Sequence, residues 1–249
     1  MTNLYRIAIL FILLILSGHA GELKELYLST QLVVVTTSDW NAVDGKLQRY
    51  ERVVPKGDWK PVGEPISIVV GKNGLGWGSG IFSADALRVV GSDDPIKKEG
   101  DGKAPAGVFR LGTAFGYAPE ILWAWKMPYL KLTESVECVD DTASRFYNRI
   151  VYRSSVKPDW NSSEHMLRND ELYRWGIVVE HNAQRVPGKG SCIFLHIWRG
   201  PGQGTVGCTA MPREQLELLL SWLTPAKDPL LLQVPTAEYI RLKGKFNLP

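Results

Sequence analysis

The sequence predicts a mainly β protein with one substantial helix near its C-terminus. Runs rich in β-branched residues recur along the chain, glycine- and proline-rich stretches separate them, and only one segment has clear helical spacing. Of the 249 residues, 45% are hydrophobic and 22% are charged, which is ordinary for a globular protein. The formal net charge of +3 is too small to indicate nucleic acid as a partner.

The first twenty residues follow the pattern of a secretory signal. A short leader with one cation precedes an apolar run at 7–16, and Ala20 ends a small-residue cleavage pattern. The apolar run is short for a membrane span. We therefore expect a signal peptide at 1–20 and a single mature domain at 21–249, which is periplasmic or otherwise extracytoplasmic. The alternative is an uncleaved anchor, and contact with a membrane would then be limited to this segment.

The first part of the mature chain is typical of strands. Residues 31–37 are β-branched, and the dipeptide Asp44-Gly45 predicts a turn into an alternating strand at 47–53, as in a hairpin. Another strand is expected at 65–70. The glycine-rich stretch at 71–80 lacks the Gly-Lys-Ser/Thr ending of a phosphate loop, so we expect a surface loop there.

A polar, turn-rich segment at 97–107 leads into the middle of the chain. Residues 117–169 are aromatic and irregular, with Trp123 and Trp125 among them, and they predict strands with long loops that form the walls of a groove. Two strong strands follow, at 175–180 and 191–198.

The C-terminal part holds the predicted helix. A glycine-rich loop at 199–207 is unsuited to helix or sheet. The helix begins near Pro212, because leucines recur beyond it at helical spacing. A last strand is expected at 230–234, and the basic tail after Pro235 is expected to drape over the surface.

The cysteine count is odd. Of Cys138, Cys192 and Cys208, at least one must be unpaired within the chain, and secreted proteins seldom keep a free thiol without a function. Cys138 and Cys192 would pair in an oxidising compartment, or Cys192 would be a small apolar residue of its strand.

The neighbours of Cys208 suggest a nucleophile. His196 lies in an apolar strand, where a polar imidazole needs a partner or a purpose. Cys208 follows Gly207 and precedes the start of the predicted helix, so we expect a positive helix end and backbone N–H groups to favour a thiolate and to stabilise an oxyanion. A strand histidine followed by a loop that returns a cysteine beside it is a workable nucleophile and base.

Other interpretations of these residues are possible. A strand histidine is more often part of the core, and a cysteine is more often structural. A zinc site from His181, Cys192, His196 and Cys208 matches none of the usual ligand spacings. A serine hydrolase has less support, because the chain has no Gly-x-Ser-x-Gly elbow.

The run from His196 through Gly207-Cys208-Thr-Ala-Met211 resembles the signature of the L,D-transpeptidase (YkuD-like) catalytic domain. That family has a strand histidine, a glycine-rich stretch and then Ser/Thr-x-Gly-Cys. A second family feature, a Thr-Pro-x-Gly-x-Phe turn, is similar to Ala104-Pro-Ala-Gly-Val-Phe109. The resemblance implies a β-sandwich-type fold with one substantial C-terminal helix and a catalytic core at about 66–235.

The resemblance also implies a reaction. In this family an extracytoplasmic cysteine attacks a carbonyl of a peptidoglycan stem peptide, D-alanine leaves, and the acyl-enzyme passes to an amine or to water. Cys208 would be the nucleophile, His196 the base and Ile197 the residue whose backbone carbonyl orients the histidine. The N–H groups of Gly207 and Cys208 would be the donors to the oxyanion. No metal or organic cofactor is implied.

The chain departs from the family pattern at two positions. Val206 stands where the family usually has a second histidine, and Ala210 stands where it usually has an arginine that helps to hold the substrate. Arg199, Arg213 and Thr205 are therefore candidate substrate-binding residues.

Three functions remain open. The first is cysteine-dependent acyl transfer on peptidoglycan peptides, which would be the protein's partners. The second is an L,D-carboxypeptidase or peptide hydrolase with the same Cys208 and His196. The third is a cell-wall-binding module without activity.

Overall fold

The computed structural model describes residues 24–89, 91–117 and 126–249. The predicted signal peptide at 1–20, Trp123 and Trp125 lie outside the described residues. Within those ranges, no helix combines the length and the apolar character that crossing a membrane requires.

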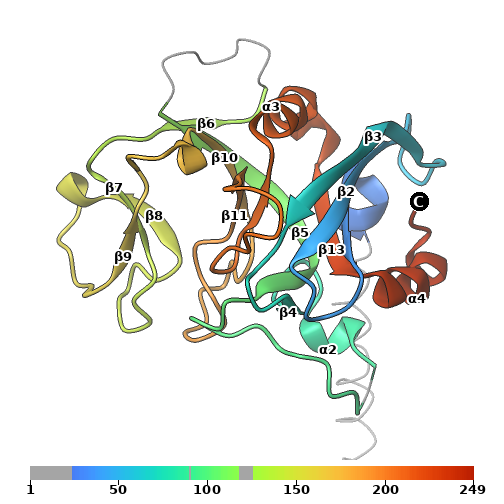
Figure 1. The fold of residues 1–249 in the computed structure, drawn as a ribbon, viewed down its shortest axis with the longest axis horizontal. Coiled ribbons are helices and arrows are strands. Elements are labelled where there is room, and N and C mark those ends of the chain that lie inside the picture. The colour runs from blue at the N-terminus through green and yellow to red at the C-terminus, as the bar shows by residue number, and fades with distance from the viewer. Residues whose placement is uncertain (1–23, 90, 118–125) are drawn as a thin grey trace, which may run out of the picture.

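Eight strands form a closed, barrel-like sheet (Figure 1). They are β1 (Gln31–Thr37), β2 (Asp44–Glu51), β3 (Lys60–Val69), β5 (Ala104–Gly116), β10 (Trp175–Val179), β11 (Phe194–Ile197), β12 (Thr209–Met211) and β13 (Leu230–Pro235). The pairing order is β10-β11-β12-β3-β2-β1-β13-β5, and β5 pairs again with β10. The mainly β prediction is confirmed. The sandwich arrangement is not confirmed, because these pairings form one continuous ring. The ring includes β1 and β2, which lie before the predicted catalytic core at about 66–235.

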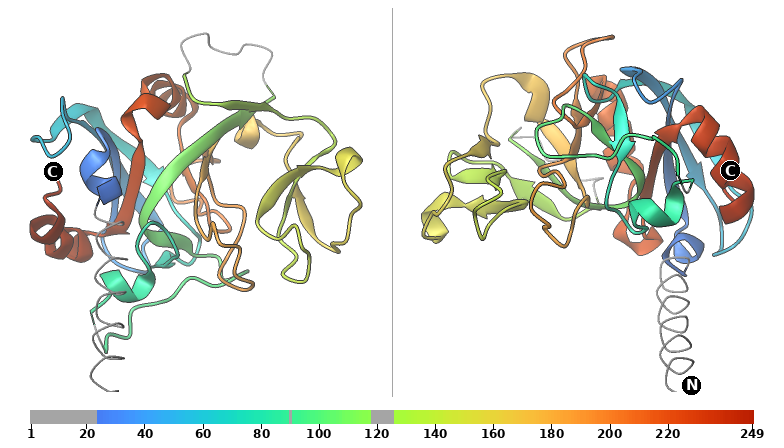
Figure 2. Two further views of the ribbon diagram at one scale, coloured as in Figure 1. Left: turned by 180° about the vertical axis from the view of Figure 1, so that it is seen from behind. Right: turned by 90° about the horizontal axis from the view of Figure 1, so that it is seen from below.

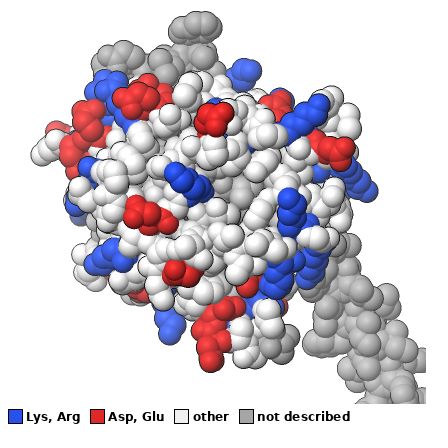
Figure 3. All heavy atoms as spheres, turned by 45° about the vertical axis from the view of Figure 1, so that its right-hand side comes forward, with Lys and Arg blue, Asp and Glu red and all other residues white. Residues whose placement is uncertain are grey.

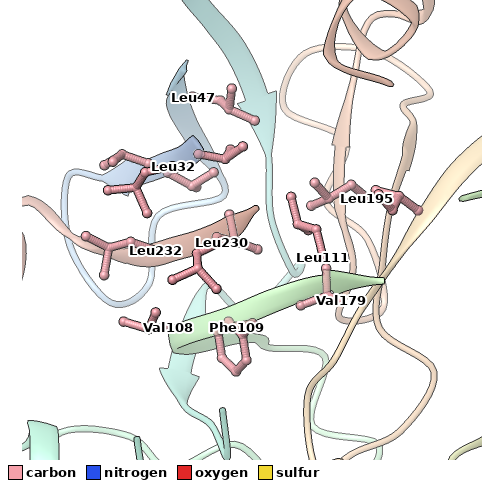
Figure 4. Packing of buried hydrophobic residues seen from close by; sticks show 14 of the residues in the cluster. Leu32, Leu47, Val108, Phe109, Leu111, Val179, Leu195, Leu230 and Leu232 are labelled. Carbon is pink, nitrogen blue, oxygen red and sulfur yellow. The ribbon is translucent and has the colours of Figure 1, made fainter. Parts of the chain in front are cut away.

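Apolar side chains from opposite parts of this ring meet in its interior. Figure 4 shows Leu32 and Leu47 from β1 and β2 on the same side as Leu232, with Leu111 and Leu195 from β5 and β11 across from them. Burial of such side chains contributes on the order of 1.5–3 kcal/mol each. The ring is therefore stabilised by its apolar core as well as by the hydrogen bonds between its strands.

The C-terminal helices differ in part from the prediction. Helix α3 (Arg213–Trp222) begins after Pro212, as expected. The tail after Pro235, however, forms a second helix, α4 (Thr236–Phe246), so the prediction of one substantial helix was wrong. Leu242 and Phe246 lie four residues apart and are buried, while the basic side chains between and around them face outward.

The remaining helical segments of the described residues are short. They are a helical stretch at 24–28, α2 (Ala84–Leu87), and the 3-10 turns η1 (Arg153–Ser155), η2 (Glu171–Tyr173) and η3 (Pro225–Lys227). Two further short strands, β4 (Leu75–Trp77) and β6 (Tyr129–Lys131), each pair in parallel with β5.

A separate three-stranded sheet stands beside the barrel (Figure 2). Its central strand β7 (Val136–Val139) pairs with β8 (Arg149–Tyr152) and β9 (Ser163–His165). A disulfide between Cys138 and Cys192 joins this small sheet to the segment before β11. The middle of the chain is therefore strands with long loops, as predicted.

Three local predictions that were based on glycine residues differ from the structure. The Asp44-Gly45 turn is wrong, because both residues lie within β2 and the turn is at 38–43, where the Asp39 carboxylate accepts N–H bonds from Asn41 and Ala42. A Cβ on Gly45 would lie 2.7 Å from the Thr36 oxygen, so this glycine serves a close approach of strands.

The stretch at 71–80 is largely buried and contains β4, so the prediction of a surface loop there was also wrong. Likewise, the Ala104–Gly107 segment, matched above to a family turn, is the first part of β5.

Charges are mixed on the surface. Figure 3 shows basic and acidic side chains intermixed over one face, in keeping with the small net charge of +3.

Candidate active site

A cavity of about 640 Å³ lies between the barrel and the small sheet. Cys208 and His196 both line it, together with parts of β9, η2 and the 198–207 loop. Cys208 is the free cysteine of the chain and is buried, with 8% of its surface exposed. The two residues that the sequence suggests as nucleophile and base therefore line the same cavity.

Parallel pairing of two short strands produces this proximity. In the β11–β12 register His196 lies opposite Ala210 and Leu195 opposite Thr209, so Cys208, just before β12, lies beside the start of β11. The Phe194 N–H donates to the Cys208 Sγ atom at 3.4 Å. The glycine-rich loop between the strands makes the return that a parallel connection needs.

One hydrogen bond fixes the state of the His196 ring. Its Nδ1 atom lies 2.7 Å from the backbone oxygen of Ile197, and because a carbonyl oxygen only accepts, Nδ1 carries the proton. The neutral ring then has its lone pair on Nε2, which is free to act as a base. Ile197 thus has the position that the sequence assigned to it.

Burial keeps both groups uncharged. It lowers the pKa of His196 to about 4, and it raises the pKa of Cys208 to about 12. The expected helix end is not beside the thiol, because Cys208 precedes the strand β12 and helix α3 begins only at Arg213. At neutral pH the two groups are therefore a thiol and a neutral imidazole.

The loop before Cys208 satisfies its own polar groups. The Gly207 N–H donates to Thr205 Oγ1 at 3.1 Å, and that hydroxyl donates to the Cys208 backbone oxygen at 2.6 Å. Thr205 and Gly207 line the cavity, but these atoms are already engaged. The N–H predicted to stabilise an oxyanion would have to leave Thr205 to do so.

The candidate arginines separate in space. Arg199 lines the cavity, whereas Arg213 lies on α3 and pairs with Glu217 at 2.9 Å. Arg168, which the sequence analysis did not single out, also lines the cavity and forms two hydrogen bonds to Asp170, at 2.9 and 2.7 Å. Arg199 and Arg168 are therefore the described arginines that can meet a substrate in this cavity.

Two further cavity residues were missed. Tyr173 donates its hydroxyl proton to Glu164 at 2.5 Å, and its ring lies edge-on to His196 with 5.2 Å between centroids. Burial raises the pKa of Glu164 and raises that of Tyr173 well above its usual value. These residues come from β9 and η2, in the irregular middle of the sequence, where no motif points to them.

No family model matches this chain, and no curated protein matches it. Among solved structures, Bd1075 of Bdellovibrio bacteriovorus is 13% identical, with a TM-score of 0.41 over 88% of this chain and 55% of that one. The helical cell shape determining protein Pgp2 of Campylobacter jejuni is 15% identical, with a TM-score of 0.41 over 85% of this chain and 53% of that one. The chain spans about half the length of each.

The four residues of the zinc alternative do not form a ligand set. Cys192 is in the disulfide with Cys138, and His181 is bound on both ring nitrogens, by the Ser79 N–H at 3.3 Å and by the Lys189 oxygen at 2.8 Å. Over residues 24–89, 91–117 and 126–249, no group of three or more His, Cys, Asp or Glu side chains is arranged to hold a metal ion.

Proposed function

We propose that this protein is an L,D-transpeptidase-like enzyme, which transfers acyl groups from peptidoglycan stem peptides through a thioester on Cys208. The observation that carries the proposal is the His196 ring in the Cys208 cavity, held by the Ile197 oxygen in the tautomer that a general base needs. The resemblance of the Thr205-Val206-Gly207-Cys208 motif supports the same chemistry.

The arrangement supplies a simple first half-reaction. The Cys208 sulfur attacks the carbonyl carbon of the donor peptide bond while its proton passes to His196 Nε2. The tetrahedral intermediate collapses, the leaving amine takes the proton from His196, and the acyl group remains on sulfur. An amine or a water molecule then attacks the thioester, with His196 again accepting a proton.

Substrate recognition must differ from the family pattern. Ala210 lines the cavity but has no charge, and Val206 is 77% exposed at its mouth. We propose that Arg168 or Arg199 supplies the cation for a carboxylate of the stem peptide, since both line the same cavity. The fold proposed here is the L,D-transpeptidase type, elaborated by the small sheet.

An extracytoplasmic location is part of the proposal. The Cys138–Cys192 disulfide supports it, because disulfides persist mainly in oxidising compartments. The signal-like sequence at 1–20 points the same way.

Covalent labelling tests the nucleophile. A carbapenem should acylate the wild-type protein once, and intact mass should show a single adduct that peptide mapping places on Cys208. Cys208→Ala should take up none. Wild-type protein that stays unlabelled at high carbapenem concentration would contradict the proposal.

Incubation with muropeptides tests the acceptor. Cross-linked or amino-acid-exchanged products support transfer, whereas trimmed peptides alone indicate a hydrolase. Binding of peptidoglycan that is equal for wild type and Cys208→Ala, with no product from either, would indicate a binding module.

A further inference from the structure

Tyr173 is a buried side chain on the wall of the cavity that holds Cys208 and His196. It is 3% exposed, yet it lines the cavity with Cys208 and His196. It lies at the end of η2, where the Asp170 carboxylate caps the turn by accepting from the Leu172 N–H at 3.1 Å. Its position is therefore fixed by local structure as well as by packing.

The hydroxyl of Tyr173 has a fixed partner. It donates to Glu164 at 2.5 Å, and the Tyr173 ring lies edge-on to His196 with 5.2 Å between centroids. Tyr173 and Cys208 also belong to the same buried cluster. Tyr173 is therefore held beside both candidate reacting residues.

An attack by Cys208 needs a donor for the oxygen that becomes negative. The Gly207 N–H, one of the two donors expected from sequence, is already bonded to Thr205, which leaves the Cys208 N–H and room for a second donor. Tyr173 lines the same cavity as Cys208, and its ring lies 5.2 Å from that of His196.

We propose that the Tyr173 hydroxyl, positioned by Glu164, donates a hydrogen bond to the carbonyl oxygen that becomes negative when Cys208 attacks. This proposal rests on the acyl-transfer function proposed above. In the step, the sulfur–carbon bond forms, the carbonyl π electrons move to oxygen, and the Cys208 proton passes to His196. Tyr173 keeps its proton throughout and only hydrogen-bonds the oxygen.

Glu164 controls where the Tyr173 proton points. As a carboxylate it accepts the Tyr173 proton, but as a neutral acid it donates to the Tyr173 oxygen and leaves the hydroxyl proton for the cavity. Burial raises the pKa of Glu164, which shifts its balance toward the neutral acid. The ionisable or charged groups that act on the Glu164–Tyr173 pair are Arg168, which opposes this shift, Asp140, which adds to it, and Cys208.

Replacement of the hydroxyl tests the donor. Loss of one oxyanion donor slows acyl transfer by roughly 10²–10³-fold, so Tyr173→Phe should slow acylation of Cys208 by a carbapenem by about that factor. Iodoacetamide forms no oxyanion, so its rate with Cys208 should change little in the same variant. Tyr147→Phe is the matched control, because it removes another buried hydroxyl, bonded to Glu99, and should leave both rates near wild type.

Two outcomes of this experiment separate the proposals. If wild-type protein is acylated and Tyr173→Phe is acylated equally fast, the role of Tyr173 is overturned and the function of Cys208 stands. If the wild type itself is not acylated, the proposed function fails first.

Glu164→Gln provides a test that does not depend on losing the hydroxyl. The amide donates to the Tyr173 oxygen at every pH, so this variant should keep most of the acylation rate. In the wild type, the acylation rate should fall as pH rises through the pKa of Glu164, and that decline should be absent in Glu164→Gln. An alkaline decline that persists in the variant, or a loss of activity as large as in Tyr173→Phe, would overturn the positioning role of Glu164.

Discussion

Thr205 donates a hydrogen bond from its hydroxyl to the backbone oxygen of Cys208 at 2.6 Å. The same oxygen atom of Thr205 accepts the Gly207 N–H at 3.1 Å. The Thr205 side chain thus holds the backbone on both sides of the peptide bond between Gly207 and Cys208. The threonine of the Thr-x-Gly-Cys motif therefore has a role within the protein as well as any contact with substrate.

Thr205→Val should destabilise the loop, because it leaves the Gly207 N–H and the Cys208 oxygen without this partner. Each unpaired buried group costs about 1–3 kcal/mol, so urea unfolding should show a clear loss and carbapenem acylation should slow. Thr205→Ser keeps the hydroxyl and should stay close to wild type in both measurements. Equal behaviour of the valine and serine variants would show that the hydroxyl does not hold the loop.

The pH dependence of alkylation follows from the buried thiol. Because burial raises the pKa of Cys208 to about 12, the thiolate is scarce at pH 7 and increases steadily above it. The iodoacetamide rate should therefore rise through pH 8–10 without a plateau, in contrast to a free thiol of pKa about 8.5. A rate that is constant between pH 5 and 8 would instead indicate a preformed thiolate–imidazolium pair. Cys208→Ala gives the background.

Two buried histidines should make the fold sensitive to acid. Burial lowers the pKa of both His181 and His196 to about 4, below the ordinary value of 6.5, so the neutral rings stabilise the folded state. That stabilisation is complete above pH 6.5 and is lost as pH falls toward 4, by up to about 3 kcal/mol for each ring.

The free energy of unfolding, measured in urea at several pH values, should therefore decline between pH 6.5 and 4. In His181→Gln the decline should be shallower by about one proton, since one of the two groups is gone. An unchanged slope in that variant would show that His181 does not contribute.

The sequence predicted the proximity of Cys208 and His196 better than the composition of the cavity around them. Cys208 and His196 lie near each other in sequence and carry a motif, and the strands that hold them have clear β-branched patterns. Glu164 and Tyr173 reach the same cavity from a sheet and a 3-10 turn whose sequence has no regular period. Their position in the cavity depends on long-range strand pairing and on a disulfide, and neither can be predicted from a local sequence pattern.

Glycine and helix signals failed for local reasons. Gly45 was interpreted as a turn residue, but it serves close strand contact, which depends on a neighbour that is distant in space. The C-terminal tail was judged by its charge, while Leu242 and Phe246 at helical spacing decide its structure by burial. In both cases tertiary contacts outweighed the local composition.

The Cys138–Cys192 disulfide should matter for the site as well as for stability. It joins β7 of the small sheet to the segment before β11, and both cysteines belong to the same buried apolar cluster as Tyr173 and Cys208. Cys192 also has a left-handed backbone, with φ of 54°, and its oxygen lies 3.6 Å from the Cys208 sulfur. The crosslink therefore holds the small sheet, which carries Glu164, close to Cys208.

A Cys138→Ala, Cys192→Ala double variant should lose about 2–5 kcal/mol of unfolding free energy, the usual effect of removing a native disulfide. Because the small sheet can then move away from β11, Cys208 should react faster with iodoacetamide, while carbapenem acylation, which needs the assembled wall, should slow. These opposite changes distinguish a loosened cavity from a general loss of fold, in which alkylation would rise to that of an unfolded control. If both rates equal those of the wild type, the disulfide stabilises the chain without organising the site.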